Sequence, residues 1–187
     1  MWRVGPSPVT IDTFQEYPHL DVPDLDSVLS LTDIAAGALT VVQPSKPRRL
    51  SIQIVTSSSA VPSRFTLHLE GKDTSERSVI EDVPLTLTGS SFTVCTNNAW
   101  TDLSLVEIRD LVGGSPGDQI SLGGNIGIGL QGPKNHHPLL WAVTQLLVNG
   151  VVAPLPSFDS IYGTVDLPGG TDSYKTYYSY TTGPQAS

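Results

Sequence analysis

Arg49-Leu-Ser-Ile-Gln-Ile-Val-Thr56 is the stretch that decides the fold class, because apolar residues occupy every second position from Leu50. Side chains at alternate positions of a strand point to the same face. Residues 64–70, Arg-Phe-Thr-Leu-His-Leu-Glu, repeat the pattern. Such alternation is typical of strands half buried in an antiparallel sheet. The residues predicted to face the core are Leu50, Ile52, Ile54, Phe65, Leu67 and Leu69.

Turn residues divide the sequence around these two stretches into further short strands. Gly71–Ser75 is a polar turn, after which residues 77–83 return as a hairpin partner. Asn149-Gly150 predicts a second hairpin, because both residues accept the positive φ of a type I′ turn. The other expected strands are residues 39–42, 91–96, 103–109, 119–122, 140–148, 151–153 and 174–181. This spacing predicts an all-β fold, an antiparallel β-sandwich of jelly-roll or immunoglobulin-like type.

Residues 1–45 differ in composition from the rest of the chain. Prolines recur through them and favour an extended backbone, while apolar residues appear every two or three positions. An isolated extended chain has no second layer to cover such side chains. We therefore expect an extended N-terminal arm (residues 1–45), with at most a helical turn at residues 26–34. The arm should lie in grooves of a β-sandwich body (residues 46–187) or of a neighbouring molecule.

The charge of the chain restricts its partners. Ten basic residues stand against 18 acidic ones, which gives a net charge of -8. Nucleic-acid binding needs a basic face that displaces counterions from phosphates. No stretch approaches the ~18 apolar residues of a membrane span, and residues 1–8 contain no apolar signal core. We therefore expect a soluble protein made in a cytoplasm, with neither nucleic acid nor membrane as a direct partner.

One glycine-rich stretch resembles a cofactor motif only in its letters. Gly127-Ile-Gly-Leu-Gln-Gly132 matches the dinucleotide fingerprint, but that motif binds pyrophosphate only where a helix begins at its end. Pro133 follows at once and opposes a helix. The single cysteine, Cys95, lies in an alternating stretch and is expected to be a buried structural thiol. We expect no cofactor.

The histidines and carboxylates do not form a recognisable metal or catalytic motif. His136 and His137 are adjacent, so in a strand they point apart and do not suit one metal site. His68 falls on the polar side of its strand and is expected to be solvated. The acidic residues within 21–26 lack the central glycine of an EF-hand loop. Because no serine elbow or Cys–His pair is present either, we expect no metal, no catalytic residue and no enzymatic activity.

Aromatic and apolar side chains are the candidate partner-binding residues. The stretch 174–181 places Tyr174, Tyr178 and Tyr180 on one face of a strand and Tyr177 on the other. Tyrosine is enriched at interfaces, but cross-strand packing within the sheet explains the same pattern, and both interpretations stay open. Together with the apolar residues of the arm, the candidates are Trp2, Val4, Ile11, Phe14, Tyr17, Leu20, Leu25, Tyr174, Tyr178 and Tyr180.

The chain resembles virion proteins of tailed bacteriophages, in particular small head decoration (cement) proteins. The likeness covers residues 38–181 and consists of short phrases in a shared order. These phrases are Pro47–Val55, Phe65–Asp73, Val106–Ile108, Gly117–Gly124, Ile126–Leu130, Tyr162–Asp166 and Asp172–Tyr178.

This resemblance implies a capsid decoration protein that binds the outside of the major capsid protein lattice. Such a protein stabilises the head through contacts between subunits, often as a homotrimer. Its expected location is the virion, on the capsid exterior, after assembly in the host cytoplasm. The alternatives are a head–tail connector or tail structural protein, and a carbohydrate- or receptor-binding β-sandwich module.

Overall fold

Every regular element in the described part of the chain is a β-strand. The computed structural model describes residues 8–18, 20, 22–57, 63–113, 117–134, 140–167, 169–170 and 172–182. The strands are β1 (Val9–Tyr17), β2 (Leu29–Asp33), β3 (Gly37–Ala38), β4 (Arg48–Val55), β5 (Ser63–Asp73), β6 (Ser78–Leu87), β7 (Phe92–Val112), β8 (Gln119–Gly129), β9 (Leu140–Val148), β10 (Val151–Ala153), β11 (Phe158–Asp159), β12 (Thr164–Asp166) and β13 (Tyr174–Thr182).

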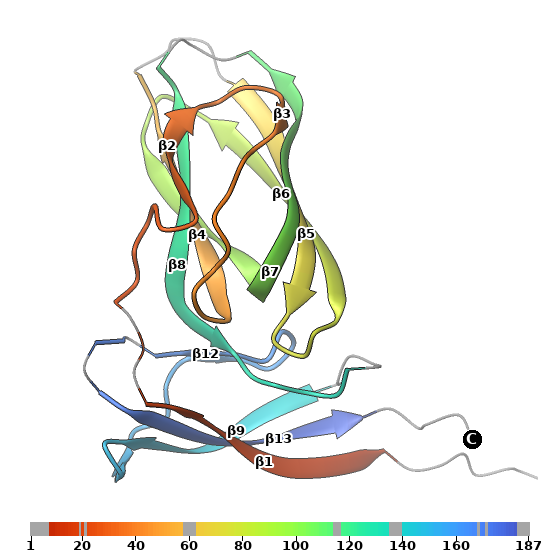
Figure 1. Ribbon diagram of the computed structural model, residues 1–187, viewed down its shortest axis with the longest axis vertical. Helices are drawn as coiled ribbons and strands as arrows, with labels where there is room; N and C mark the ends of the chain where they lie inside the picture. Colours follow the sequence, from red (N-terminus) through yellow and green to blue (C-terminus); the bar gives the residue numbers. More distant parts are fainter. Residues whose placement is uncertain are drawn as a thin grey trace, which may run out of the picture.

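Nine of these strands form a large sheet that curls around the main core. Its order is β11-β12-β8-β4-β7-β5-β6, with β2 added to β8 and β3 added to β7. All of its pairings are antiparallel. The 21-residue strand β7 pairs with β4 through its first part and with β5 through its second, so one strand serves both layers. The predicted all-β, antiparallel, sandwich-like fold is confirmed (Figure 1).

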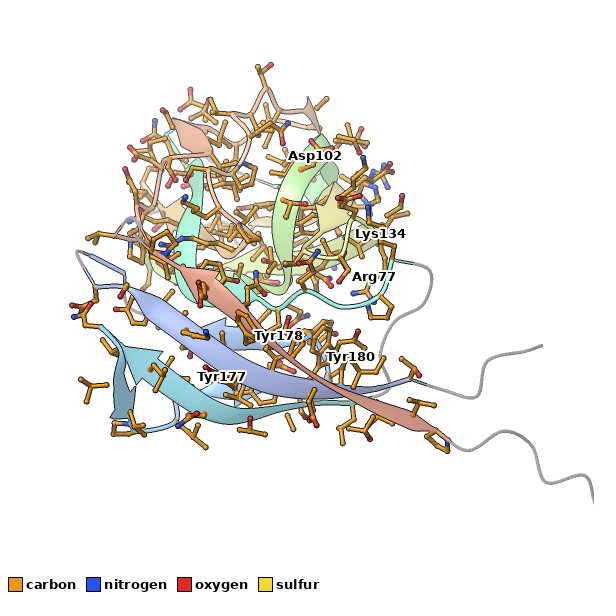
Figure 2. The ribbon with its side chains drawn as sticks, turned by 60° about the horizontal axis from the view of Figure 1, so that its bottom comes forward. Arg77, Asp102, Lys134, Tyr177, Tyr178 and Tyr180 are labelled. Carbon is orange, nitrogen blue, oxygen red and sulfur yellow. The ribbon has the colours of Figure 1, made fainter. Side chains whose placement is uncertain are left out.

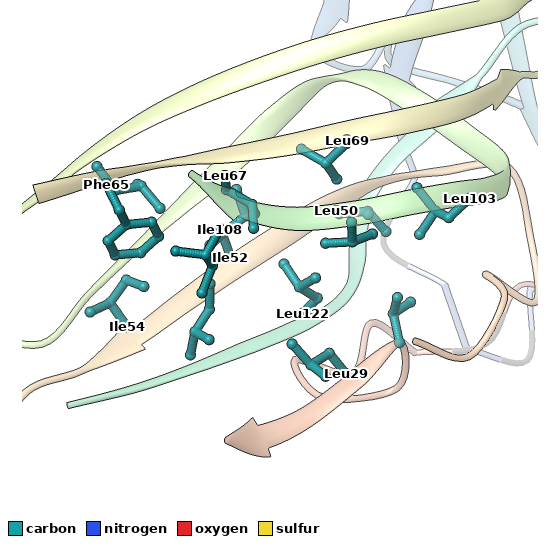
Figure 3. Close-up of a cluster of buried hydrophobic side chains, with 14 of the residues drawn as sticks. Leu29, Leu50, Ile52, Ile54, Phe65, Leu67, Leu69, Leu103, Ile108 and Leu122 are labelled. Carbon is teal, nitrogen blue, oxygen red and sulfur yellow. The ribbon is translucent and has the colours of Figure 1, made fainter. Parts of the chain in front are cut away.

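The main core consists of the side chains that alternate along the central strands. The six residues predicted from residues 49–56 and 64–70 are all buried, with at most 3% of any side chain exposed. They pack with Leu29, Leu103, Ile108 and Leu122 in the interior of the curled sheet (Figure 3). Burying a side chain of this size contributes about 1.5–3 kcal/mol. The period of two read from the sequence therefore accounts for this part of the fold.

A small four-stranded sheet lies beneath the large sheet in Figure 1, in the order β1-β13-β9-β10. One of its faces covers a second core between the two sheets. The hairpin from β9 to β10 turns at Asn149 and Gly150, whose φ values are 51° and 79°. The predicted turn is therefore confirmed. The buried residues of the second core are Tyr17, Leu20, Ile128, Leu130, Trp141, Leu146, Val165, Leu167, Tyr174 and Tyr178.

Three hydrogen bonds tie the small sheet to residues 129–132, where the chain leaves β8. They run from the Tyr17 hydroxyl to the Gly129 carbonyl oxygen (3.0 Å), from the Tyr178 hydroxyl to the Gln131 carbonyl oxygen (2.8 Å), and from the Gln131 amide to Gln15 Oε1 (3.0 Å). Two come from β1 and one from β13. These bonds fix the small sheet against the body of the protein.

The structure does not divide the chain at residue 45. Within the expected arm, β1 pairs along its whole length with β13, β2 pairs with β8, and β3 pairs with β7. β1 therefore belongs to the small sheet and β2 and β3 to the large sheet, so these segments do not form a separate arm. The local pattern identified their apolar side chains correctly, but it carried no information on which distant strands cover them.

Three local predictions also need correction. Residues 26–34 contain β2 and no helical turn, and residues 39–42 form no strand. The expected strands at 91–96 and 103–109 are parts of the continuous β7. The register between β7 and its neighbours shifts at several points. Because a bulge inserts an extra residue, it interrupts alternation without ending the strand.

Candidate protein-binding face

The small sheet has a second face, which we call the outer face. Paired residues of neighbouring strands point to the same side of a sheet, so the strand register identifies the residues opposite the second core. Along β1 and β13 they are Thr10, Asp12, Phe14, Glu16, Lys175, Tyr177, Ser179 and Thr181, and along β9 and β10 they are Leu140, Ala142, Gln145, Leu147 and Val152.

Large apolar side chains on the outer face are open to solvent. Phe14 is 52% exposed, Leu140 is 53% exposed and Val152 is 65% exposed. Tyr177 and Leu147 are partly exposed and lie between Phe14 and Val152, whereas Leu140 lies opposite Thr181 at the other end of β9. Scattered exposed apolar residues are ordinary on soluble proteins, whereas a contiguous group on a regular sheet is typical of a binding surface.

An aromatic pair and one cation form the centre of the outer face. The rings of Phe14 and Tyr177 are 5.8 Å apart between centroids. Lys175 Nζ lies 4.0 Å from the Phe14 ring centroid and 5.3 Å from that of Tyr177, which are cation–π distances. The same ammonium group contacts Glu16 Oε1 at 2.7 Å. The hydrogen bond to Glu16 is the largest cause of the raised pKa of Lys175.

This arrangement makes the centre of the outer face nearly neutral. The Lys175 charge is matched by Glu16, and its side chain covers aromatic surface. Charged residues are depleted and aromatic residues enriched in the cores of protein–protein interfaces. The cluster of Phe14, Tyr177 and Lys175 on β1 and β13 has this aromatic composition, while Asp12 on the same face is an exposed carboxylate.

A hollow opens at the end of the outer face, beside the Asn149-Gly150 turn. Its volume is about 330 Å³, and its lining includes Leu147, Lys175, Glu16 and Tyr174. Interface anchors are side chains that enter such a pocket and lose their water there. The hollow can therefore receive one apolar or aromatic side chain of a partner.

The structure separates the candidate partner-binding residues into different environments. Phe14 lies on the outer face, but Tyr17, Leu20, Tyr174 and Tyr178 are at most 7% exposed in the second core. Tyr178 and Tyr180 both extend from β13 of the small sheet (Figure 2). Tyr180 packs beside Trp141, with ring centroids 5.4 Å apart. These five are packing residues of the subunit, which corrects their interpretation as partner contacts. The predicted split of the tyrosines is confirmed, since Tyr177 alone lies on the outer face.

The remaining candidates lie elsewhere. Ile11 is 39% exposed on the body-facing side of β1, and Leu25 is 41% exposed beside Gly123 of β8. Trp2 and Val4 lie outside the described residues, as do His136 and His137.

Sequence reasoning missed four residues of the outer face, because alternation does not reveal which face of a sheet another layer covers. These are Leu140, Leu147, Val152 and Lys175.

His68 is not solvated, which corrects the expectation from its strand. Only 4% of this residue is exposed. Its Nδ1 lies 2.6 Å from Asp82 Oδ1, and its Nε2 lies 2.8 Å from Glu70 Oε1. The hydrogen bond to Glu70 is the largest cause of a raised His68 pKa, and Asp82 acts in the same direction. The side chain points outward from the core, as predicted, but two carboxylates cover it.

The other motifs have structural environments in the described residues. Cys95 is half-buried, with its Sγ 3.1 Å from Asn125 Nδ2. Gly127 and Gly129 lie within β8, where added Cβ atoms would meet Arg49 and Thr74. No group of three His, Cys, Asp or Glu side chains suited to a metal ion occurs among the described residues. No helix in that part of the chain is long and apolar enough to cross a membrane.

Comparisons with known proteins give no relative. No protein-family model, no curated protein and no solved structure matches the chain.

Proposed function

We propose that the protein is a non-enzymatic structural protein of a tailed-phage virion that decorates the head. In this proposal it binds the outside of the major capsid protein lattice through the outer face of the small sheet. The observation that carries the proposal is the uncovered group of Phe14, Tyr177, Leu147 and Val152 on that face.

The outer face has the physical properties that protein binding needs. A sheet held by regular hydrogen bonds presents its side chains without loss of backbone entropy on binding. Aromatic side chains bury a large area and lose few rotamers. The near-neutral centre suits an apolar patch on another protein, while the net charge of -8 opposes association with nucleic acid.

Many weak contacts would suffice for stabilisation. A decoration protein occupies repeated positions on a lattice, so each copy adds buried area at a boundary between capsid subunits. A copy that contacts two capsid subunits raises the free-energy cost of separating those subunits, because its contacts with both cannot be kept when they move apart. The resemblance to decoration proteins supports this position over other places in the virion.

The test uses heads assembled without this protein, to which the purified protein is added. The double substitution Phe14→Ala, Tyr177→Ala should weaken binding about tenfold or more, which corresponds to about 1.4 kcal/mol or more. The matched control is Ile80→Ala, which removes a 65% exposed side chain of β6 in the large sheet. Copies per head and the thermal stability of the heads are measured.

The outcomes separate the proposal from its alternatives. Two results together support head decoration. The number of bound copies matches the number of lattice positions, and the double substitution weakens binding whereas the control does not. A few copies at one vertex indicate a connector or tail component. If the heads bind nothing, or both variants bind like the wild type, the proposal is wrong. Binding of the protein to host surface sugars would then favour the carbohydrate- or receptor-binding alternative.

A further inference from the structure

The described edge strands include the ends of the two strand orders, β1, β10, β11 and β6, and the added strands β2 and β3, which each pair on one side. β2 and β3 are short, with five and two residues, and three of the other four are protected against pairing with another chain. An edge strand exposes unpaired amide and carbonyl groups, and natural proteins shorten, charge or interrupt such edges. β10 has three residues and is followed by Pro154 and Pro156. β11 has two residues.

The long edge strand β6 carries two protective features. Pro84 has no amide hydrogen to donate and lies within the strand. Glu81 points inward and accepts hydrogen bonds from the amides of Asn97 (2.6 Å) and Asn98 (3.0 Å). A proline and an inward-pointing charge both oppose edge-to-edge pairing.

β1 is the exception. It runs for nine residues and pairs with β13 throughout, with no shift in register. Residues 9–17 contain no proline, lysine or arginine, and their two charged residues, Asp12 and Glu16, lie on the outer face and do not point into the core. The described part of the chain pairs no strand with its other edge. β1 is the outermost strand of the small sheet, beside β13 (Figure 1).

We propose that the free edge of β1 pairs with β1 of a second copy of this chain. The two strands would run antiparallel about a two-fold axis perpendicular to the sheet, centred on Thr13. This register uses all nine residues, from Val9 opposite Tyr17 to Thr13 opposite itself. Any other centre leaves residues of one strand unpaired.

The charges on β1 also favour this centre. With the axis at Thr13, Asp12 lies opposite Phe14 and Glu16 lies opposite Thr10. Moving the axis to Phe14 places Asp12 opposite Glu16, and moving it to Asp12 places that carboxylate opposite its own copy. Like charges directly opposite each other destabilise a strand pair. The sequence of β1 therefore suits self-pairing in one register.

The pairing has consequences for symmetry and for the outer face. Because the same surface is used by both copies, the contact is isologous and gives a dimer, in place of the trimer that the resemblance implies. The axis keeps both outer faces on one side, so the two Phe14 side chains become diagonal neighbours in an eight-stranded sheet. The inference rests on β1 alone and does not require the proposed function.

A cysteine cross-link tests the register. In a Cys95→Ser background, Thr13→Cys places two thiols opposite each other, where the Cα separation of an antiparallel pair permits a disulfide. The matched control Gln15→Cys places its thiols four residues apart along the strands, beyond disulfide reach. Under mild oxidation, we expect a covalent dimer for Thr13→Cys and none for Gln15→Cys.

Sedimentation of the unmodified protein tests the dimer itself. We expect a concentration-dependent dimer that Thr13→Lys weakens roughly fivefold or more, because two ammonium groups then face each other. Thr86→Lys on the protected edge β6 should leave the dimer unchanged, and thermal unfolding confirms that both variants are folded. A monomer, a trimer, or a dimer without the Thr13 cross-link overturns the inference. Head binding is measured separately, so either proposal can fail alone.

Discussion

The large sheet and the small sheet use alternating side chains in different ways. The large sheet curls until its inner face encloses a core, and β2 and β3 extend its two layers. The small sheet is open, and only the face with Trp141 and Tyr178 is covered. The same period of two therefore produces a closed core in one region and an exposed apolar face in the other. Coverage depends on tertiary packing and not on the pattern itself.

The N-terminal segment makes the comparison sharper, because it contributes to both regions. β1 forms the free edge of the small sheet, whereas β2 and β3 join the large sheet. One stretch of similar composition thus supplies both protected and unprotected strands. Each of the three strands pairs with one neighbour, and what differs is length, since β1 has nine residues whereas β2 has five and β3 has two.

The largest expected effect is in the closed core. Ile52→Ala should lower the free energy of unfolding by about 2–5 kcal/mol, because Ile52 is fully buried and its loss leaves a cavity. Urea unfolding followed by tryptophan fluorescence measures the change. The control Ile80→Ala, on the exposed side of β6, should change stability by less than about 0.5 kcal/mol. Equal effects of the two substitutions would contradict the distinction between core and surface.

A smaller effect is expected where the small sheet meets residues 129–132. Burial raises the pKa of Tyr178 to about 12, and its hydroxyl donates to the Gln131 carbonyl oxygen. Tyr178→Phe leaves that acceptor without its donor and should cost about 1–3 kcal/mol. Tyr162→Phe, in an exposed turn, is the control. If Tyr178→Phe unfolds like the wild type, this hydrogen bond does not hold the small sheet.

The smallest effect is expected from pH, within the large sheet. The folded-state pKa of His68 is raised, so protonation is favoured by folding. This stabilisation is fully present below the unfolded pKa of about 6.5 and is lost as the pH rises through the higher folded value. The wild type should therefore lose more stability than His68→Gln between about pH 6 and about pH 8. Thermal unfolding at both pH values measures the difference, and parallel losses would exclude His68 as its source.

Local signals in the sequence predicted much of the fold. The alternation around Ile52 and Leu67, and the turn at Asn149-Gly150, depend on neighbouring residues, and the structure confirms them. The pairing of β1 with β13 joins segments at opposite ends of the chain. No local pattern encodes such a pairing, so the N-terminal segment was interpreted as a separate arm.

The candidate site was predictable only in part. Phe14 was named as a partner-binding candidate of the N-terminal segment and is exposed on the outer face, and Tyr177 was placed opposite the other tyrosines. The assignment of a face to solvent or to the core needs the second layer, and this reversed the interpretation of Tyr174 and Tyr178. His68 shows the same limit, since Asp82 covers it from the neighbouring strand.

The three hydrogen bonds at residues 129–132 have a mechanical consequence. They join β1 and β13 to the end of β8, and β8 pairs along its length with β4. We expect a torque applied to the small sheet to pass through these bonds into the centre of the large sheet. Under load the two sheets should therefore rotate together as one rigid unit.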